Sequence, residues 1–426
     1  MAKFSVFIPC NLLPVVISAA FGVSVLAAAP EAENARTKPE WKRAAEARIQ
    51  QYRMSDCEVI VTDGFGNPLE GAEVELKMQQ HAYWFGTAVN VPYFLYGGDR
   101  EGGAERPVDW QSPPNDDVRR YREAIKEWFN VAVFENLLNP APFGWLDPGE
   151  RADTYRVLKW LDEHQIPVRG HYLVGHAKFF GDGQLHDPGV QETAIAHGYD
   201  KAWELRGRFV QWDAFNHPLS TGAPVDFIER SLRAMRAADP HTPLYLNEQW
   251  ILAGGAEYDR RTRYLELARE LKARDVPLDG LGAMGHMLAD HLLTEPEDLV
   301  ATLDAIGEIG LPVIVTEHDF RLEDESLAPG YEEKFLVTVY SHPVSEGIIL
   351  WGFTDLAHWH GGAVLYDSEW NLKPAGKVWQ RYVKGEWWTD AAGQTDAYGR
   401  FVERLTHGDY TLEVRHGGRT VHREVK

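Results

Sequence analysis

Cysteine is almost absent from this chain, which carries two in 426 residues, Cys10 and Cys57. Cys10 lies in an N-terminal segment that is expected to be cleaved, so the remaining chain keeps Cys57 alone and cannot form an internal disulfide. Stability must therefore come from a large hydrophobic core. A chain of roughly 400 residues buries enough surface to supply one.

Long apolar runs are also lacking. Residues 1–28 have the features of a secretory signal peptide, with Lys3 ahead of an apolar stretch and small residues around Ala27 and Ala28, where cleavage is expected. Nothing later in the chain approaches the run of about 20 apolar residues that a membrane-spanning helix needs. The sequence thus predicts a secreted or periplasmic protein that has no membrane partner once the signal is removed.

Basic residues are in short supply. Lysine and arginine number 43 against 64 aspartate and glutamate, for a formal net charge of -21. Such a negative field disfavours nucleic acid and anionic membrane surfaces as partners. Aromatic residues are plentiful in contrast, with 15 Trp, 17 Tyr and 18 Phe. Most should pack in the core, but flat aromatic faces are also surfaces on which sugar rings stack.

The two ends of the chain carry alternating apolar and polar residues, a pattern typical of half-buried strands. Residues 29–54 form a charged linker or short helix, residues 55–82 follow as two strands around a turn, and residues 385–426 contain three more strands. Neither set can bury a face alone, so we expect both to pair in one small β-sandwich. The turn phrase Val-Thr-Asp-Gly-x-Gly-Asn-Pro at 61–68 resembles that of the carboxypeptidase regulatory-like sandwich.

Between these ends, residues 83–384 alternate short apolar runs with amphipathic helices, as parallel βα units do. Eight such runs over roughly 300 residues predict a TIM barrel, an α/β fold of (β/α)8 type whose active site lies at the carboxyl ends of the strands. A doubly wound open sheet is the alternative, but no Gly-rich phosphate loop follows any strand. The runs lie at 85–89, 131–134, 168–173, 210–215, 244–246, 281–284, 313–316 and 348–350.

Polar side chains stand at the ends of seven of these eight runs. Polar residues at so many strand ends are hard to explain by structural roles alone. A retaining glycosidase needs two groups about 5 to 5.5 Å apart, one to attack the anomeric carbon and one to protonate the departing oxygen. Strands four and seven face each other across a barrel mouth, so Asn216, His217 and Glu317 are suitably placed. The other residues at strand ends are Glu135, Asn136, His171, Asn247, Glu248, His286 and Trp351.

The run Trp212-Asp213-Ala214-Phe215-Asn216-His217-Pro218 resembles the Trp-Asp-x-x-Asn-Glu-Pro motif of family 10 glycoside hydrolases, the xylanase family. The resemblance covers almost the whole barrel. It implies a xylanase-like O-glycosyl hydrolase that cleaves a β-linked plant or algal polysaccharide or oligosaccharide by a retaining mechanism. Further segments similar to motifs of the family are 129–136, 170–176, 244–248, 316–319, and 351–355 with Trp359.

The resemblance also implies roles at matching positions. Glu317 would be the nucleophile and His286 the residue that holds and tunes it, while Asn216 would bind the 2-hydroxyl of the sugar being cleaved. No cofactor and no metal ligand are implied, and a monomer is expected. The remaining substrate-binding candidates are Glu135, Asn136, His171, Asn247, Glu248, Trp351 and Trp359.

Four positions depart from the family pattern. The acid/base Glu of the family is His217 here, a subsite Lys is Asn139, a strand-three Trp is Gly175, and a strand-six Gln is Met284. These changes keep the nucleophile and the anchoring Asn but alter the sugar contacts. Protonated imidazole can itself donate to a leaving oxygen. We therefore assign His217 as the proton donor, with Glu248 on the next strand as the alternative.

Two other functions stay open. The chain could be a carbohydrate-binding pseudoenzyme, because its binding groups match the family better than its proton donor does. It could also be a metal-dependent hydrolase, because several histidines fall near the mouth and His358-Trp359-His360 pairs two of them closely. The absence of a His-Glu-x-x-His motif disfavours the second. The histidines near the mouth are His171, His176, His217, His286, His318, His358 and His360.

Overall fold

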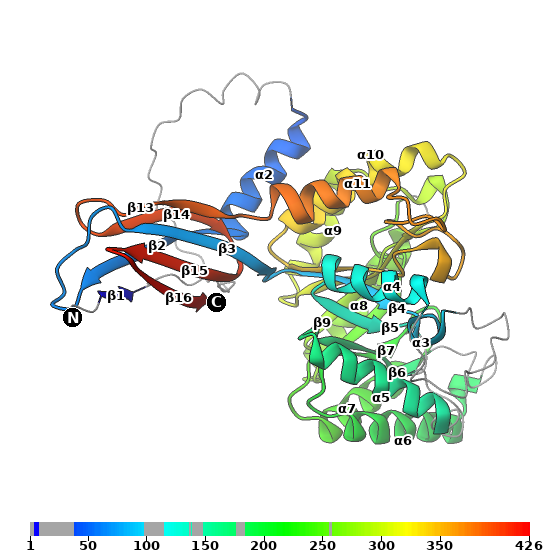
Figure 1. Cartoon of the computed structure of the whole chain (residues 1–426). Coiled ribbons are helices and arrows are strands. Elements are labelled where there is room, and N and C mark those ends of the chain that lie inside the picture. The colour runs from blue at the N-terminus through cyan, green and yellow to red at the C-terminus, as the bar shows by residue number, and fades with distance from the viewer. Residues whose placement is uncertain are drawn as a thin grey trace. The chain divides into compact units, whose positions relative to one another are not determined.

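The computed structural model describes residues 4–7, 38–97, 115–135, 138, 148–175, 184–254 and 258–426. They form two compact units, each of which combines segments that are distant in the sequence (Figure 1). One unit comprises Trp84–Val339 and Val344–Trp379. The other comprises Met1–Tyr83, Tyr340–Pro343 and Gln380–Lys426.

The first unit is a barrel of eight parallel strands: β4 (Trp84–Val89), β5 (Val131–Phe134), β6 (Val168–Gly175), β7 (Phe209–Asn216), β8 (Leu244–Gln249), β9 (Gly280–Met284), β11 (Val313–Phe320) and β12 (Ser345–Leu350). The barrel closes because β12 pairs with β4, with Ile348 opposite Phe85, and β11 pairs with both β12 and β9. A short strand, β10 (His286–Met287), adds to β11. The (β/α)8 prediction is therefore confirmed.

Helices alternate with these strands along the chain. They are α3 (Val91–Tyr96), α4 (Asp116–Trp128), α5 (Pro148–Glu163), α6 (Pro188–Glu204), α7 (Val225–Ala238), α8 (Tyr258–Ala273), α9 (Pro296–Gly307), α10 (Ala328–Ser341) and α11 (Pro374–Arg381). Their buried faces follow the sequence pattern: α7 buries Phe227, Leu232 and Met235 on one face. Across the part of the chain that the structure describes, no helix has the length and apolar character that a membrane span requires.

Shorter helical turns interrupt the loops of the chain. Among the described residues these are the 3-10 turns η2 (Gln184–His186), η4 (Asp290–Leu292), η5 (Glu325–Leu327) and η6 (Asp355–Ala357), and the π-helical turn η7 (Tyr382–Glu386). Of these, η6 begins the segment after β12 that carries His358, Trp359 and His360.

The barrel wall is packed without room to spare at one glycine. Trp212 on β7 is fully buried, and a methyl group added at Gly170 on the neighbouring β6 would lie 2.1 Å from its ring atom Cε3. The absent side chain of Gly170 leaves room for the large indole of Trp212 beside β6. Dense packing of this kind keeps the strands that carry polar end residues in fixed positions.

The second unit is the β-sandwich. One sheet contains β1 (Phe4–Phe7), β2 (Met54–Asp63) and β14 (Arg400–Thr406), and the other contains β13 (Ala391–Gln394), β3 (Glu73–His81), β15 (Gly408–His416) and β16 (Arg419–Val425). N-terminal β3 pairs with C-terminal β15, with Leu76 opposite Leu412. Apolar residues of both sheets, among them Val59 of β2 and Leu412 of β15, form a single core that includes the buried Cys57.

Helix α2 (Glu40–Tyr52) lies directly before β2, within the segment expected to be a linker or helix. The adjoining Arg53 donates to the carbonyls of Tyr340 and His342 at 2.6 Å, so its guanidinium satisfies two buried acceptors. Residues 4–7, inside the predicted signal peptide, pair with β2. The signal assignment stays a prediction.

Candidate active site

The carboxyl ends of the barrel strands bring most of the candidate residues together. Asn136 lies outside the described residues. Trp359 follows η6, in the loop after β12, and is half exposed, whereas Glu317 is buried. The other candidates follow or end the strands: Glu135 after β5, His171 on β6, Asn216 and His217 at the end of β7, Asn247 and Glu248 on β8, His286 on β10, and Trp351 after β12.

Two neighbours hold the carboxylate of Glu317 in place. Asn247 donates its amide Nδ2 to Oε1 at 2.9 Å, and Nε2 of His286 lies 3.0 Å from Oε2. Burial by itself would raise the pKa of Glu317, but the hydrogen bond from His286 and the charges of His171 and His286 hold this pKa below its ordinary value. Glu317 is therefore a fixed, ionised carboxylate, which is the form that acts as a nucleophile.

The ring of His286 is itself held from the other side. Its Nδ1 lies 2.7 Å from Oδ1 of Asp319. Burial would lower the pKa of His286, but the charge and hydrogen bond of Asp319 and the bond to Glu317 raise it to about 10. Burial also opposes ionisation of Asp319, yet His286 holds the pKa of Asp319 well below its usual range. The three groups form a chain of carboxylate, imidazolium and carboxylate.

Asn247 connects β11, the strand of Glu317, with β7. Besides Glu317, its Nδ2 donates to Oδ1 of Asn216 at 3.0 Å, while its own Oδ1 accepts from the hydroxyl of Thr316 at 2.7 Å. These bonds fix which end of the Asn247 amide is oxygen. Because Oδ1 of Asn216 accepts from Asn247, its Nδ2 is the end that suits a ligand hydroxyl.

His217 lies in a left-handed backbone conformation, with φ of 56°. Residues other than glycine adopt this region at a cost in free energy, and backbone contacts hold it here. The N–H of His217 donates to the carbonyl of Asn247 at 2.7 Å, and its own carbonyl accepts from the hydroxyl of Thr221 at 2.7 Å. The ring is mostly buried, and its Nδ1 lies 3.7 Å from Oε1 of Glu248, at ion-pair distance.

Glu248 is fully buried and surrounded by donors. Its oxygens accept from the backbone N–H groups of Leu219 at 2.7 Å, Ser220 at 3.1 Å and Gln249 at 3.0 Å, and from the hydroxyl of Ser220 at 2.6 Å. Burial would raise the pKa of Glu248, but the adjacent His217 and the Ser220 hydroxyl hold it below its ordinary value. An ionised carboxylate so occupied accepts protons rather than donating one.

Side chains on the predicted glycone side of the site are also held by hydrogen bonds and ring contacts. Nδ1 of His171 lies 2.8 Å from Oδ2 of Asp213, and both terminal nitrogens of Arg169 bind the same Asp213 carboxylate. The His171 ring meets the Trp351 ring edge to face, with centroids 4.9 Å apart. After β5, Glu135 accepts from the Asn90 amide at 2.9 Å.

Asp319 lies in the motif-like segment 316–319, but the sequence analysis gave it no role. It stands two positions after Glu317 on the same strand, and alternate residues of a strand point to the same face, so the spacing was a usable signal. Asp319 also accepts from Nε1 of Trp359 at 2.8 Å. His318, grouped above with the histidines of the mouth, instead faces α10: its ring bonds Glu332 at 2.8 Å and stacks on Phe335.

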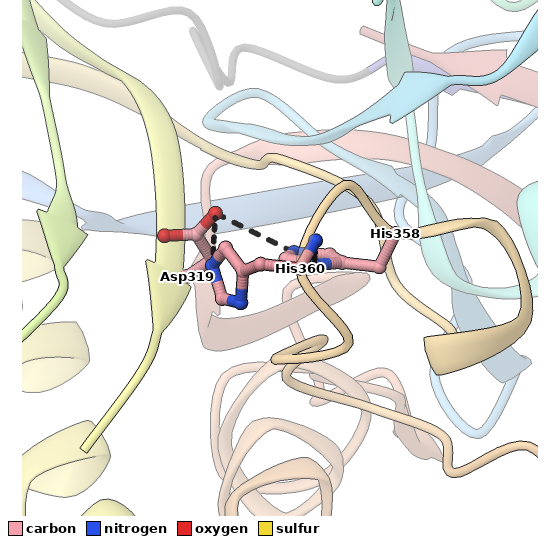
Figure 2. A group of neighbouring side chains, drawn as sticks. All are labelled: Asp319, His358 and His360. Carbon is pink, nitrogen blue, oxygen red and sulfur yellow. Dashed lines mark hydrogen bonds and ion pairs between the residues drawn. The ribbon is translucent and has the colours of Figure 1, made fainter. Parts of the chain in front are cut away.

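One group of side chains in the described residues has the composition of a metal site. Oδ2 of Asp319 and ligand atoms of His358 and His360 lie within 4.8 Å of one another. In Figure 2 both rings lie beside the Asp319 carboxylate. This cluster adjoins Glu317 through His286 but does not include it.

A barrel with an ionised carboxylate clamped at its strand ends is the arrangement of a glycoside hydrolase. The profile described as Glycosyl hydrolase family 10 matches residues 109–381, well over half of the chain, so the chain belongs to that family.

Curated relatives and solved structures agree with this. The chain is 28% identical to Anti-sigma-I factor RsgI6 of Acetivibrio thermocellus over 388 residues, 88% of this chain and 47% of that protein. It is 27% identical to Endo-1,4-beta-xylanase 2 of Arabidopsis thaliana, over 67% of this chain and 28% of the relative. The chain thus spans less than half the length of these relatives. Xylanase 10B of Thermotoga petrophila, solved with xylobiose, shares the fold, with a TM-score of 0.57 at 20% identity over 71% of this chain and 94% of that one.

Proposed function

We propose that this chain is a retaining glycoside hydrolase that cleaves β-linked xylan-type oligosaccharides or polysaccharides, with Glu317 as the nucleophile. The observation that carries the proposal is the clamp on Glu317. Its two oxygens are held by Asn247 and His286, and its pKa is kept low. A carboxylate that is ionised and fixed needs no reorganisation before it attacks the anomeric carbon.

His217 is the proton donor in this proposal. It occupies the position of the family's acid/base on the strand beside Asn247, and its charge is among those that lower the pKa of Glu317. Glu248 is a poor alternative, because its carboxylate is ionised and already accepts four hydrogen bonds. Its negative charge 3.7 Å from the His217 ring suits a cationic imidazolium instead.

The proposed reaction has two steps. A carboxylate oxygen of Glu317 attacks the anomeric carbon, the bond to the departing oxygen breaks, and the imidazolium of His217 gives its proton to that oxygen. Water then attacks the same carbon, frees Glu317, and passes a proton to the neutral His217. The Asn216 amide, oriented by Asn247, suits a hydrogen bond to the 2-hydroxyl of the sugar.

Xylan-type substrates are favoured by the similar proteins. Endo-1,4-beta-xylanase 2 of Arabidopsis thaliana is named for that substrate, and the Thermotoga petrophila xylanase was solved with xylobiose. In this chain, the half-exposed ring of Trp359 offers a flat face on which a sugar can stack.

The proposal is tested by trapping the covalent intermediate. The purified protein would be incubated with an activated 2-deoxy-2-fluoro-β-xyloside, which slows hydrolysis of a glycosyl-enzyme ester, and the labelled peptide identified by mass spectrometry. Label on Glu317, together with products of retained β configuration by NMR, is expected. Label on another carboxylate, or inverted products, would remove Glu317 from the role of nucleophile.

A second candidate function is carbohydrate binding with little turnover. The replacement of the family's acid/base by His217 favours it. Loss of a general acid typically lowers rates by about 10² to 10⁴-fold. Titration calorimetry with xylo-oligosaccharides, followed by product analysis after long incubation, separates the two: binding without product formation identifies a binder.

A further inference from the structure

Two buried imidazoles converge on one carboxylate oxygen beside the proposed nucleophile (Figure 2). Nε2 of His358 and Nε2 of His360 each lie 3.4 Å from Oδ2 of Asp319. The side chains of Asp319 and His358 are fully buried, and that of His360 is 6% exposed. The cluster joins the end of β11 to the loop that follows β12.

These separations suit metal ligands better than hydrogen-bonded partners. In a tetrahedral complex with metal–ligand bonds of about 2.1 Å, any two of the ligand atoms stand about 3.4 Å apart. A nitrogen and an oxygen that share a proton approach to about 2.9 Å. Both contacts to Asp319 have the first spacing, and all three donor atoms fall within 4.8 Å of one another.

Three ring nitrogens of these two histidines are unsatisfied in the part of the chain that the structure describes. Nε2 of His358 and both ring nitrogens of His360 have no hydrogen-bond partner there. Buried polar atoms without a partner are rare in folded proteins, and an ion that is absent from the coordinates is one of their explanations. Two unsatisfied imidazoles aimed at one carboxylate point to a cation between them.

We propose that Asp319, His358 and His360 bind a divalent transition-metal ion, with Zn²⁺ the best match. Imidazole and carboxylate ligands suit Zn²⁺, and three protein ligands leave a fourth position for water or an anion. Asp319 keeps its other oxygen for His286. The ion would tie the His358-to-His360 loop to β11. It would thereby hold Trp359, which lies between the two histidines and already donates to Asp319.

One feature limits the affinity of this site. Nδ1 of His358 accepts from the backbone N–H groups of His360 and Gly362 at 3.3 and 3.2 Å, which places the proton of the neutral ring on Nε2. A metal bound at Nε2 moves that proton to Nδ1 and costs both of these long contacts. The site therefore fits reversible binding rather than the permanent retention of a structural zinc.

Metal titration of the whole chain tests the site. After treatment with a chelator, calorimetric titration with Zn²⁺ is expected to show one ion per chain and a higher Tm. Co²⁺ should give the intense visible bands of a tetrahedral complex. His360→Ala should weaken Zn²⁺ binding by about tenfold or more, whereas His291→Ala, at an exposed histidine, should bind as the parent does.

Two outcomes would overturn the assignment. One is the absence of stoichiometric Zn²⁺ binding by the parent chain. The other is binding by His360→Ala as tight as that of the parent, which would place the ion elsewhere. Should His360→Ala fail to fold, judged by circular dichroism in chelator, the Co²⁺ spectrum of the parent decides: weak octahedral bands contradict a site made of these three ligands.

Discussion

Glu317 and Asp319 bind opposite nitrogens of one imidazole. His286 lies 3.0 Å from the first carboxylate and 2.7 Å from the second, and the two acids stand two positions apart on β11. A ring held at both nitrogens cannot rotate, so the bond that steadies Glu317 persists while its charge changes during a reaction. The position of Glu317 thus depends on a neighbour on its own strand as well as on Asn247.

Glu317→Gln should abolish glycosidase activity and keep sugar binding. The amide preserves the shape of the side chain and its place between Asn247 and His286, but it is too weak a nucleophile to form the ester. Hydrolysis of aryl β-xylosides and calorimetric affinity for xylo-oligosaccharides are the measurements. Turnover equal to that of the parent would show that another residue is the nucleophile.

Asn247→Ala should lower kcat/KM by about 100-fold, because misplacement of a reacting group by about 1 Å has costs of this size. The variant removes the donors to Glu317 and Asn216 and leaves the Thr316 hydroxyl without its acceptor. The free energy of unfolding should fall by about 1 to 3 kcal/mol. Steady-state kinetics and urea unfolding check both effects, and parent-like kinetics would mean that Asn247 positions nothing.

His217→Ala should slow substrates in proportion to how much their leaving groups need a proton. Xylo-oligosaccharides should lose about 10² to 10⁴-fold in rate, while aryl glycosides with acidic phenol leaving groups should lose far less. A uniform loss across leaving groups would contradict a role as proton donor.

His217→Glu restores the acid/base residue typical of the family, whereas His217→Ala removes the proton donor from the same position. A large gain on oligosaccharides indicates that the natural chain is a weakened hydrolase. A loss indicates that the imidazole belongs to a working site in which the nearby Glu248 carboxylate complements a cation and would repel a second acid.

The sandwich should lose stability in mild acid because of His81. Burial lowers the pKa of His81 to about 4, outweighing the bond to the Val383 carbonyl. The unfolded chain has the ordinary pKa near 6.5 and takes up the proton first. The stabilisation is therefore complete above about pH 6.5 and declines towards pH 4, by at most about 3 kcal/mol. Urea unfolding of the parent and of His81→Gln at several pH values tests this. If the free energy of unfolding falls equally with pH in both proteins, His81 is not the cause of the acid sensitivity.

Gly170→Ala and Gly330→Ala form a matched pair. A methyl group at Gly170 meets the buried Trp212 ring at 2.1 Å, whereas nothing lies within 4 Å of one at Gly330 on α10. The first change should destabilise the chain by about 1 to 3 kcal/mol through overpacking. The second should stabilise it by about 0.5 to 1 kcal/mol, because alanine favours helix. Thermal unfolding measures both, and similar Tm values would show that the barrel tolerates repacking at β6.

The sequence predicts the barrel well because short apolar runs coincide with its strands, and its motifs locate Asn216 and Glu317 near the carboxyl ends of β7 and β11. It ends the seventh run at Thr316, whereas β11 continues through Phe320. Residues 317–319 of this strand are polar, so a search for apolar runs does not detect them. The bridge from Asn247 to Asn216 and the bond from Asn90 to Glu135 join separate strands, so they depend on strand register in space.

Both units pair an early strand with a late one: β3 pairs with β15, and β4 pairs with β12. During synthesis at about 5 to 20 residues per second, His81 leaves the ribosome roughly a quarter of a minute to one minute before Gly408. Strand β3 must wait through that interval without its β15 partner, and β4 likewise waits for β12. An unpaired strand edge is the kind of surface that chaperones protect from aggregation. Folding of both units is therefore completed late in translation or after it.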